Sequence, residues 1–240
     1  MTQLEKVERY LRAQMVRNRE RQGTPQAGAR PFITISRQAG AGGHRLAQSL
    51  LETFAAEENE LFDGWQVFDK RLCELVADDS TYTHSLDSLL AEEYRTRTDE
   101  FFHQILRSSV DQRAVAEKVF RVVRAVASVG KAIIIGRAGS EVTRDMDGGI
   151  HVRLIASETV RIHGVMDHYG IEEKAARGES KRLDTARARL LKTHFGVDIA
   201  DPTRYDVVFN TDQVSIGTIT DLLVVMVRNE ISIPRLADSM

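Results

Sequence analysis

A glycine-rich stretch that follows an apolar run constrains the fold of this chain most strongly. Residues 32–35 form a short apolar run rich in β-branched side chains, and glycines follow at positions 40, 42 and 43. Apolar residues then recur at helical spacing between Leu46 and Phe54. This order predicts a strand, a glycine turn and a helix. Such a turn directs backbone N–H groups into one concavity at a helix N-terminus, where the helix dipole favours an anion.

The stretch departs from the usual phosphate-binding pattern, G-x-x-x-x-G-K-[ST]. With Gly42 at the second glycine position, Arg37 stands at the first. Gly43 then replaces the lysine, and His44 replaces the hydroxyl residue that would hold magnesium. The dinucleotide pattern G-x-G-x-x-G also fails. Two interpretations therefore stay open on the residues alone: a phosphate cradle, or a tight strand-to-helix turn that needs positive φ.

The composition fits one globular core and excludes several classes of protein. The 240 residues are 42% hydrophobic and 28% charged, enough for one core with a small inserted subdomain. We find no apolar stretch of about eighteen residues and no secretory signal, so we expect a soluble, cytoplasmic protein with no membrane partner. The single cysteine, Cys73, excludes an internal disulfide and fits a reducing compartment.

A basic segment lies between Lys174 and Lys192, although the net charge of the chain is −2. Seven cations fall there against two acids, Glu179 and Asp184. Bulk nucleic-acid binders are usually basic overall, so the segment favours a compact anionic ligand, with a solvated helix face as the alternative. We expect this segment to be helical and to be broken near Gly178.

Five apolar runs separated by helical patterns predict the fold class. The runs span residues 32–36, 65–69, 132–136, 150–156 and 205–210. Their alternation with helices predicts an α/β protein with a mostly parallel sheet and helices on both faces. The N-terminal residues 1–28 are separate: a narrow apolar stripe predicts a polar helix, and a linker follows. The stripe consists of Leu4, Val7, Leu11 and Met15.

We expect the N-terminal helix to dock on the main body or on a second copy of the chain, which makes a homo-oligomer a candidate assembly.

Two polar side chains stand at predicted strand ends, where ligands of open α/β sheets bind. Asp69 is a candidate contact for a substrate or metal, or a cap for a helix that starts near Lys70. Arg137 follows a buried run, and its planar guanidinium suits phosphate, with a structural ion pair as the alternative.

Four stretches in order resemble the cytidylate-kinase-like proteins, a branch of the P-loop nucleoside monophosphate kinases. They are ITISRQAGAGG (33–43), VFDKRL (67–72), IIIGRAG (133–139), and DTARARLLK with DPTRYDVVFNT (184–192 and 201–211). The resemblance covers residues from about 31 to 228. It implies a P-loop-type parallel sheet in a domain of residues 29–240, with a helical substrate-binding insertion at about 71–110 and a lid at about 174–195.

The resemblance implies a kinase that uses ATP and Mg²⁺ to phosphorylate a nucleoside monophosphate, nominally CMP or dCMP, so that its partners are small nucleotides. The implied ATP- and phosphate-binding residues are Ser36, Arg37, Gly40, Gly42, Gly43 and His44. The implied acceptor contacts are Asp69 and Arg137. The implied catalytic residues of the lid are Arg182, Asp184, Arg187 and Arg189. The lid arginines would close over the transferring group, with Asp184 orienting one of them.

Departures from the family pattern leave the activity open. Gly43 and Ala138 stand where true cytidylate kinases carry a lysine and an acid, and Leu190 and Leu191 stand where the family carries lid aromatics. Arg37, His44, Arg45 or a lid arginine would have to supply the lost charge. The alternatives are a nucleotide-binding protein with little turnover, whose lid reports occupancy to a partner, and a kinase of another small anionic or hydroxylated acceptor.

Overall fold

The protein is described from a computed structural model, which covers residues 31–78 and 110–229 and, near the N-terminus, residues 5, 7, 9, 10, 12 and 13. The strands are β1 (Phe32–Arg37), β2 (Gln66–Phe68), β3 (Ala132–Ile135), β4 (Gly149–Ile155) and β5 (Val207–Asn210). They form one sheet in the order β2-β3-β1-β4-β5, and every neighbouring pair is parallel. The α/β class and the parallel sheet that the sequence predicts are therefore confirmed.

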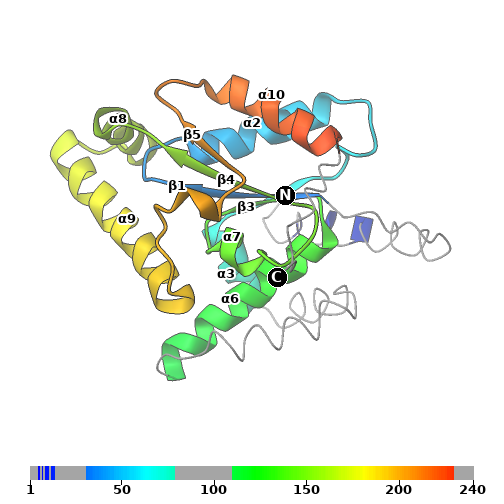
Figure 1. The fold of residues 1–240 in the computed structure, drawn as a ribbon, viewed down its shortest axis with the longest axis horizontal. Coiled ribbons are helices and arrows are strands. Elements are labelled where there is room, and N and C mark those ends of the chain that lie inside the picture. The colour runs from blue at the N-terminus through cyan, green and yellow to red at the C-terminus, as the bar shows by residue number, and fades with distance from the viewer. Residues whose placement is uncertain are drawn as a thin grey trace.

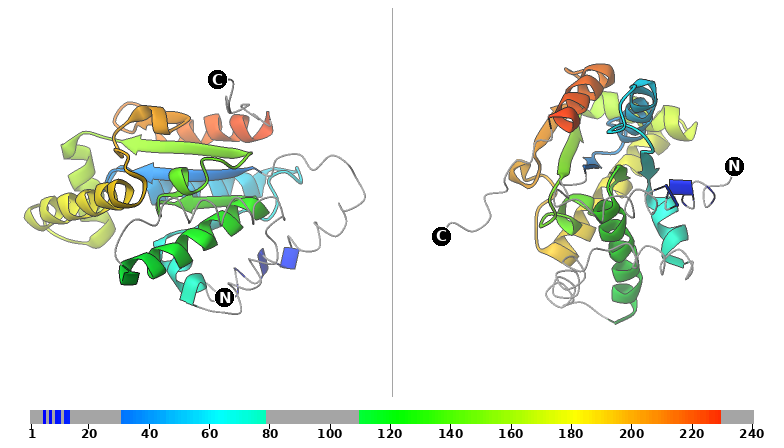
Figure 2. Two further views of the ribbon diagram at one scale, coloured as in Figure 1. Left: turned by 60° about the horizontal axis from the view of Figure 1, so that its bottom comes forward. Right: turned by 90° about the vertical axis from the view of Figure 1, so that its right-hand side faces the viewer.

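Helices cover both faces of the sheet (Figures 1 and 2). One face carries α2 (Gly43–Ala56) and α10 (Ile216–Arg228). The other face carries α3 (Lys70–Asp78), α6 (Val110–Val129) and the short α7 (Gly139–Val142). Two further helices, α8 (Glu158–Tyr169) and α9 (Glu173–Phe195), follow β4, and the 3₁₀ helix η1 (Pro202–Arg204) precedes β5. The two helices after β4 lie beyond the end of that strand, at the left of Figure 1.

The alternation of side chains along the strands divides the core into two layers. Ile33 and Ile35 of β1 are buried and pack with the buried apolar residues of α2 and α10. Phe32, one residue out of phase, packs instead with the residues of α3 and α6. Because both faces of the strands are covered, the apolar runs are continuous rather than alternating with polar residues.

The described part of the N-terminal helix docks on this second layer. Val7 is fully buried there, and the hydroxyl of Tyr10 donates to the carbonyl oxygen of Gly130 at 2.6 Å. The Tyr10 ring meets Phe68 edge to face, with ring centroids 5.4 Å apart. Docking on the body of the same chain was one of the two alternatives predicted, whereas Tyr10 was not part of the predicted stripe. Assembly through this helix remains a prediction.

Helix α9 runs without interruption from Glu173 to Phe195, so the predicted break near Gly178 is wrong. A glycine inside an exposed helix costs only about 1 kcal/mol relative to alanine. Ion pairs along the helix surface offset part of that cost, among them Arg177 with Glu173 at 2.7 Å and Arg182 with Glu179 at 2.6 Å. A single glycine is therefore too weak a signal to end a helix of this length.

Replacing Gly178 by alanine is expected to stabilise the protein by up to about 1 kcal/mol, because the new methyl group meets nothing within 4 Å. For a chain of this size the melting temperature should rise by roughly 2–4 °C. The matched control is Gly196→Ala, which also enters open space but has φ +71°, a value that strains alanine. A thermal melt in which Gly178→Ala lowers the midpoint, or in which both variants behave alike, would contradict this account.

The remaining predicted boundaries have mixed outcomes. The predicted lid, at about 174–195, coincides with α9, and its action as a lid remains a prediction. The predicted insertion at about 71–110 begins inside α3, but residues 79–109 lie outside the described part of the chain. No helix within the described ranges is long and apolar enough to cross a membrane.

Candidate functional site

The glycine turn takes the conformation that its sequence requires. Gly40 and Gly42 have φ of +79° and +86°, so the predicted need for positive φ is confirmed. Gly42 is the N-cap of α2 and supplies no side-chain cap. The N-terminal N–H groups of this helix of 14 residues therefore face the turn, where the helix dipole favours an anion.

Helix α8 packs directly on the backbone of this turn. A Cβ atom on Gly40 would lie 1.9 Å from the carbonyl oxygen of Arg161, and a Cβ atom on Gly164 would lie 2.4 Å from the carbonyl oxygen of Gly40. Only two glycines allow the backbones to approach so closely. The turn is therefore held between β1 and α8, which fixes the direction of its N–H groups.

The carboxylate of Asp184, on α9, joins three elements at the turn. It accepts from the backbone N–H of Ala39 at 2.7 Å and from a guanidinium nitrogen of Arg161, on α8, also at 2.7 Å. It accepts as well from Arg187, one turn further along α9, at 3.0 Å. Asp184 thus ties α9 to the glycine turn and orients the Arg187 side chain. Arg161 was not among the predicted site residues, since only the packing of α8 against the turn brings it there.

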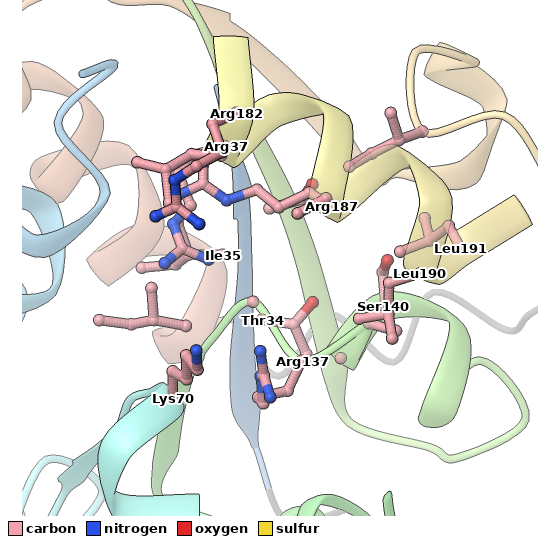
Figure 3. Close-up of a pocket in the computed structure, with 18 residues that line it drawn as sticks. Thr34, Ile35, Arg37, Lys70, Arg137, Ser140, Arg182, Arg187, Leu190 and Leu191 are labelled. Atoms are coloured by element: carbon pink, nitrogen blue, oxygen red, sulfur yellow. The ribbon is translucent and has the colours of Figure 1, made fainter. Parts of the chain in front are cut away.

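Arg37 leaves β1 at its end and lies between the glycine turn and the end of β3 (Figure 3). Its side chain is half-buried and, within the described ranges, makes no hydrogen bond or ion pair. Burial lowers the pKa of Arg37 to about 9, and the nearby cations Arg187 and Arg137 add to this effect. The guanidinium still carries its charge at neutral pH, and its surroundings favour an added anion.

Ser36 is held by an interior network that the sequence analysis missed. Its hydroxyl accepts from Arg153 at 2.9 Å and lies 3.2 Å from the hydroxyl of Tyr205, which in turn donates to the carbonyl oxygen of Ile199. Arg153 is only 5% exposed. A lone arginine within the apolar run of residues 150–156 was the available signal, because a buried cation needs partners. The network fixes the residue that precedes Arg37.

The two predicted acceptor contacts also have structural partners. An oxygen of Asp69 accepts from the backbone N–H of Leu72 at 2.8 Å, so Asp69 caps α3, as one of its two interpretations predicted. Arg137 pairs with Glu74 of α3 at 3.0 Å, which is the ion pair offered as its alternative. Arg137 and Ala138 both have positive φ, 53° and 54°, a conformation that costs roughly 1–2 kcal/mol per residue. Strained non-glycine residues of this kind cluster at functional sites.

Of the remaining predicted site residues, His44 and Arg182 each line one of the cavities described below, whereas Arg189 does not. His44 is exposed at the start of α2, and its ring stacks on His168 of α8 at a centroid distance of 5.5 Å. Desolvation, the nearby Arg37 and His168 itself lower the pKa of His44, which disfavours a positive charge on this ring. Arg182 is exposed and paired with Glu179. Arg189 is exposed and lines neither of the cavities described below.

Two cavities meet at these residues. The first, which we call the loop cavity, has a volume of about 710 Å³ and lies over the glycine turn, between α3 and α8. The second, the sheet-edge cavity, has a volume of about 230 Å³ and lies between the ends of β1 and β3 and helix α9 (Figure 3). Four residues line both cavities and so form a shared wall: Arg37, Lys70, Leu183 and Arg187.

The sheet-edge cavity is cationic. Among the described residues that line it there is no aspartate or glutamate, whereas five lining residues carry positive charge. Those five are Arg37, Lys70, Arg137, Arg182 and Arg187. Leu190 and Leu191 of α9 form part of its apolar wall. The loop cavity differs, since acids join its lining, among them Asp69 and Glu74.

Comparisons with known proteins agree with this architecture. The sequence model of the cytidylate kinase-like family matches residues 32–213. An uncharacterized protein from Eubacterium ventriosum has a similar solved structure, with a TM-score of 0.64 and 22% identity over 83% of this chain and 99% of that one. This likeness shows a shared fold. A shikimate kinase from Bacteroides thetaiotaomicron matches with a TM-score of 0.45 and 14% identity over 83% of this chain and 99% of that one. No curated protein sequence matches the chain.

Proposed function

Because the chain belongs to the cytidylate kinase-like family, we propose that it transfers a phosphoryl group from ATP to a nucleoside monophosphate, nominally CMP or dCMP. Family membership supports the coarser statement, that the chain is nucleotide kinase-like. The observation that supports phosphoryl transfer from ATP to a nucleoside monophosphate is the shared wall of the two cavities, which contains Arg37 and Arg187. A donor on one side of these arginines and an acceptor on the other would meet at the group to be transferred.

The loop cavity suits the donor phosphates. The N-terminal N–H groups of α2 face it and require no movement to accept an anion, since α8 already holds the turn. Arg37 lies at the side of the turn with a guanidinium that no described residue pairs. Phosphoryl transfer is catalysed largely by positioning and by charge, so a rigid turn with fixed donors is the kind of site that the reaction requires.

The sheet-edge cavity suits the acceptor phosphate. Arg137 lines it, and the ion pair with Glu74 fixes the guanidinium without consuming all of its donors. In the proposed step an oxygen of the acceptor phosphate attacks the terminal phosphorus of ATP. The bond from that phosphorus to the bridging oxygen breaks, and ADP leaves. Arg187, oriented by Asp184, neutralises negative charge on the oxygens of the transferring group.

The donor set fits a Mg²⁺ ion that arrives with the phosphates of ATP. No group of three or more potential metal-binding side chains occurs in the described ranges. Mg²⁺ in kinases needs few protein ligands, because phosphate oxygens, waters and one or two carboxylates complete its shell. Asp69 is the carboxylate that lines the loop cavity beside the start of α3, and we assign it this contact. When bound, the ion would neutralise charge on the terminal phosphates.

The test is ADP production by the purified protein with ATP and Mg²⁺, run with CMP, dCMP, UMP, AMP, GMP and no acceptor. We expect turnover that depends on the acceptor. In the variant Arg137→Ala, kcat/KM should fall at least tenfold, a loss of about 1.4 kcal/mol of transition-state stabilisation. The matched control is Arg144→Ala, which removes a surface arginine whose side chain is 44% exposed, and its activity should equal that of the wild type.

Two outcomes would overturn the proposal. If no acceptor raises ADP production above the background while ATP still raises the melting temperature, the chain binds nucleotide without transferring phosphate to these acceptors. If an acceptor is phosphorylated and Arg137→Ala behaves like Arg144→Ala, the acceptor binds elsewhere.

A further inference from the structure

The Arg37 side chain occupies the space that a side chain at position 43 would need. A Cβ atom built on Gly43 would lie 3.0 Å from Cγ and 3.2 Å from Cδ of Arg37. These distances are shorter than ordinary van der Waals contact, so the aliphatic stem of Arg37 runs directly over Gly43. In the usual phosphate-binding pattern the residue at this position is the lysine, and the residue at position 37 is a glycine.

A second glycine makes room for the other end of the same side chain. A Cβ atom on Gly136, at the end of β3, would lie 2.2 Å from a terminal guanidinium nitrogen of Arg37. The stem therefore crosses the turn at Gly43, and the guanidinium reaches the wall shared by the two cavities. This is the position at which donor and acceptor phosphates would meet.

The other cations near the turn are less suited to replace the missing lysine. Arg187 and Arg137 are paired with Asp184 and Glu74. Lys70, which also lines the shared wall, lies 4.0 Å from Glu74, and its side chain is 67% exposed, so solvent screens its charge. Arg45 is exposed on α2, where solvent screens its charge. Desolvation and the neighbouring Arg37 lower the pKa of His44, which disfavours a positive charge on its ring. Among these candidates, Arg37 is the charged group that reaches the shared wall without a described partner.

We propose that Arg37 supplies the positive charge that a lysine provides in the usual phosphate-binding loop, and that this chain has exchanged the two positions. Glycine at 37 with lysine at 43 becomes arginine at 37 with glycine at 43. This inference rests on the proposed function, which identifies the bound group as a terminal phosphate of ATP. The exchange also explains why Gly43, which needs no positive φ, is a glycine: a side chain there would displace Arg37.

The experiment compares four variants with the wild type: Arg37→Gly, Arg37→Gln, Gly43→Lys and the double variant Arg37→Gly/Gly43→Lys. The measurement is the dissociation constant of ATP with Mg²⁺, and of inorganic tripolyphosphate as a second probe, by calorimetry. Circular dichroism and thermal melts check that each variant folds. Arg37→Gln keeps the stem and removes only the charge, so it remains informative if Arg37→Gly is unstable.

We expect Arg37→Gly and Arg37→Gln to weaken binding of both probes at least tenfold. Gly43→Lys alone should also weaken binding, because it displaces the Arg37 stem. The double variant, which restores the usual pattern, should bind within about threefold of the wild type, since it moves the cation back to the other position. Such rescue would not follow if Arg37 had only a packing role.

Three results would overturn the inference: unchanged binding in both Arg37 variants, a double variant that binds no better than Arg37→Gly, or a wild type that binds neither probe. If instead binding depends on Arg37 and is rescued in the double variant, while no acceptor is phosphorylated, the inference holds and the proposed kinase activity fails. Binding and turnover therefore separate the two proposals.

Discussion

Replacing Arg187 by alanine is expected to lower kcat/KM for phosphoryl transfer at least 100-fold. The guanidinium lines both cavities, and Asp184 holds it at 3.0 Å, so it meets the transferring group already oriented. Arginines that neutralise this group contribute factors of about 10³–10⁵ in related reactions. We expect a smaller loss here, of at least 100-fold, because neighbouring cations still neutralise part of the charge on the transferring group. Burial lowers the pKa of Arg187, which indicates that its charge is poorly solvated until an anion arrives.

The control for this variant is Arg177→Ala, on the same helix. Arg177 is half-exposed and pairs only with surface glutamates, Glu173 and Glu158, among the described residues. Exposed pairs contribute about 0–1 kcal/mol, so stability and activity should both stay close to those of the wild type. Steady-state kinetics with ATP and the best acceptor measure both variants. Equal kcat/KM values for the two would place the transferring group away from α9.

Replacing Gly40 by alanine is expected to destabilise the protein by about 3 kcal/mol or more. The methyl group would overlap the backbone of Arg161 in α8. The helix cannot easily move away, because Gly164 of the same helix packs on the turn. The φ of +79° adds a cost of roughly 1–2 kcal/mol for alanine. Chemical denaturation with urea measures the free energy of unfolding, and a loss below about 1 kcal/mol would contradict the close packing of α8 on the turn.

The sheet was predictable because its signal is local and repeated. Each strand is a short apolar run, and all five lie within two residues of their predicted bounds. The fifth strand begins at Val207 rather than at Tyr205, since the carboxylate of Asp206 accepts from the backbone N–H of His151 just before the ladder starts. A bond of that kind depends on a neighbour 55 residues away, which no local pattern contains.

The errors and omissions lie where a weak local signal competes with packing. Gly178 was predicted to end a helix, but ion pairs and helix length outweigh one glycine. The positive φ values of Arg137 and Ala138 were not predicted, because nothing in their residue types requires that conformation. Tyr10 was missed since its burial depends on docking against Gly130, 120 residues away.

The candidate site was predictable in outline and not in its connections. The glycine turn, Arg37, Asp69, Arg137 and Arg187 were all singled out, and the structure brings them to two adjoining cavities. Asp184, also singled out, lines neither cavity and instead holds Arg187. Their partners were not: Glu74 for Arg137 and Arg161 for Asp184 are contacts between elements distant in sequence. Residue types indicate which chemistry is available, whereas the pairing of charges is decided only when the helices pack.

The close approach of α8 to the glycine turn also limits how relatives of this chain can diverge. Gly40 leaves room for the backbone of Arg161 in α8, and Gly164 leaves room for the backbone of Gly40, so a side chain at either position forces the helix away from the turn. Once the helix has moved, the close approach no longer requires Gly164, whereas the φ of +79° still favours glycine at position 40. Gly164 should therefore occur in relatives that also keep Gly40. A glycine in the helix after the fourth strand, paired with the turn glycine, would then identify chains with this arrangement even where the rest of the sequence has drifted beyond recognition.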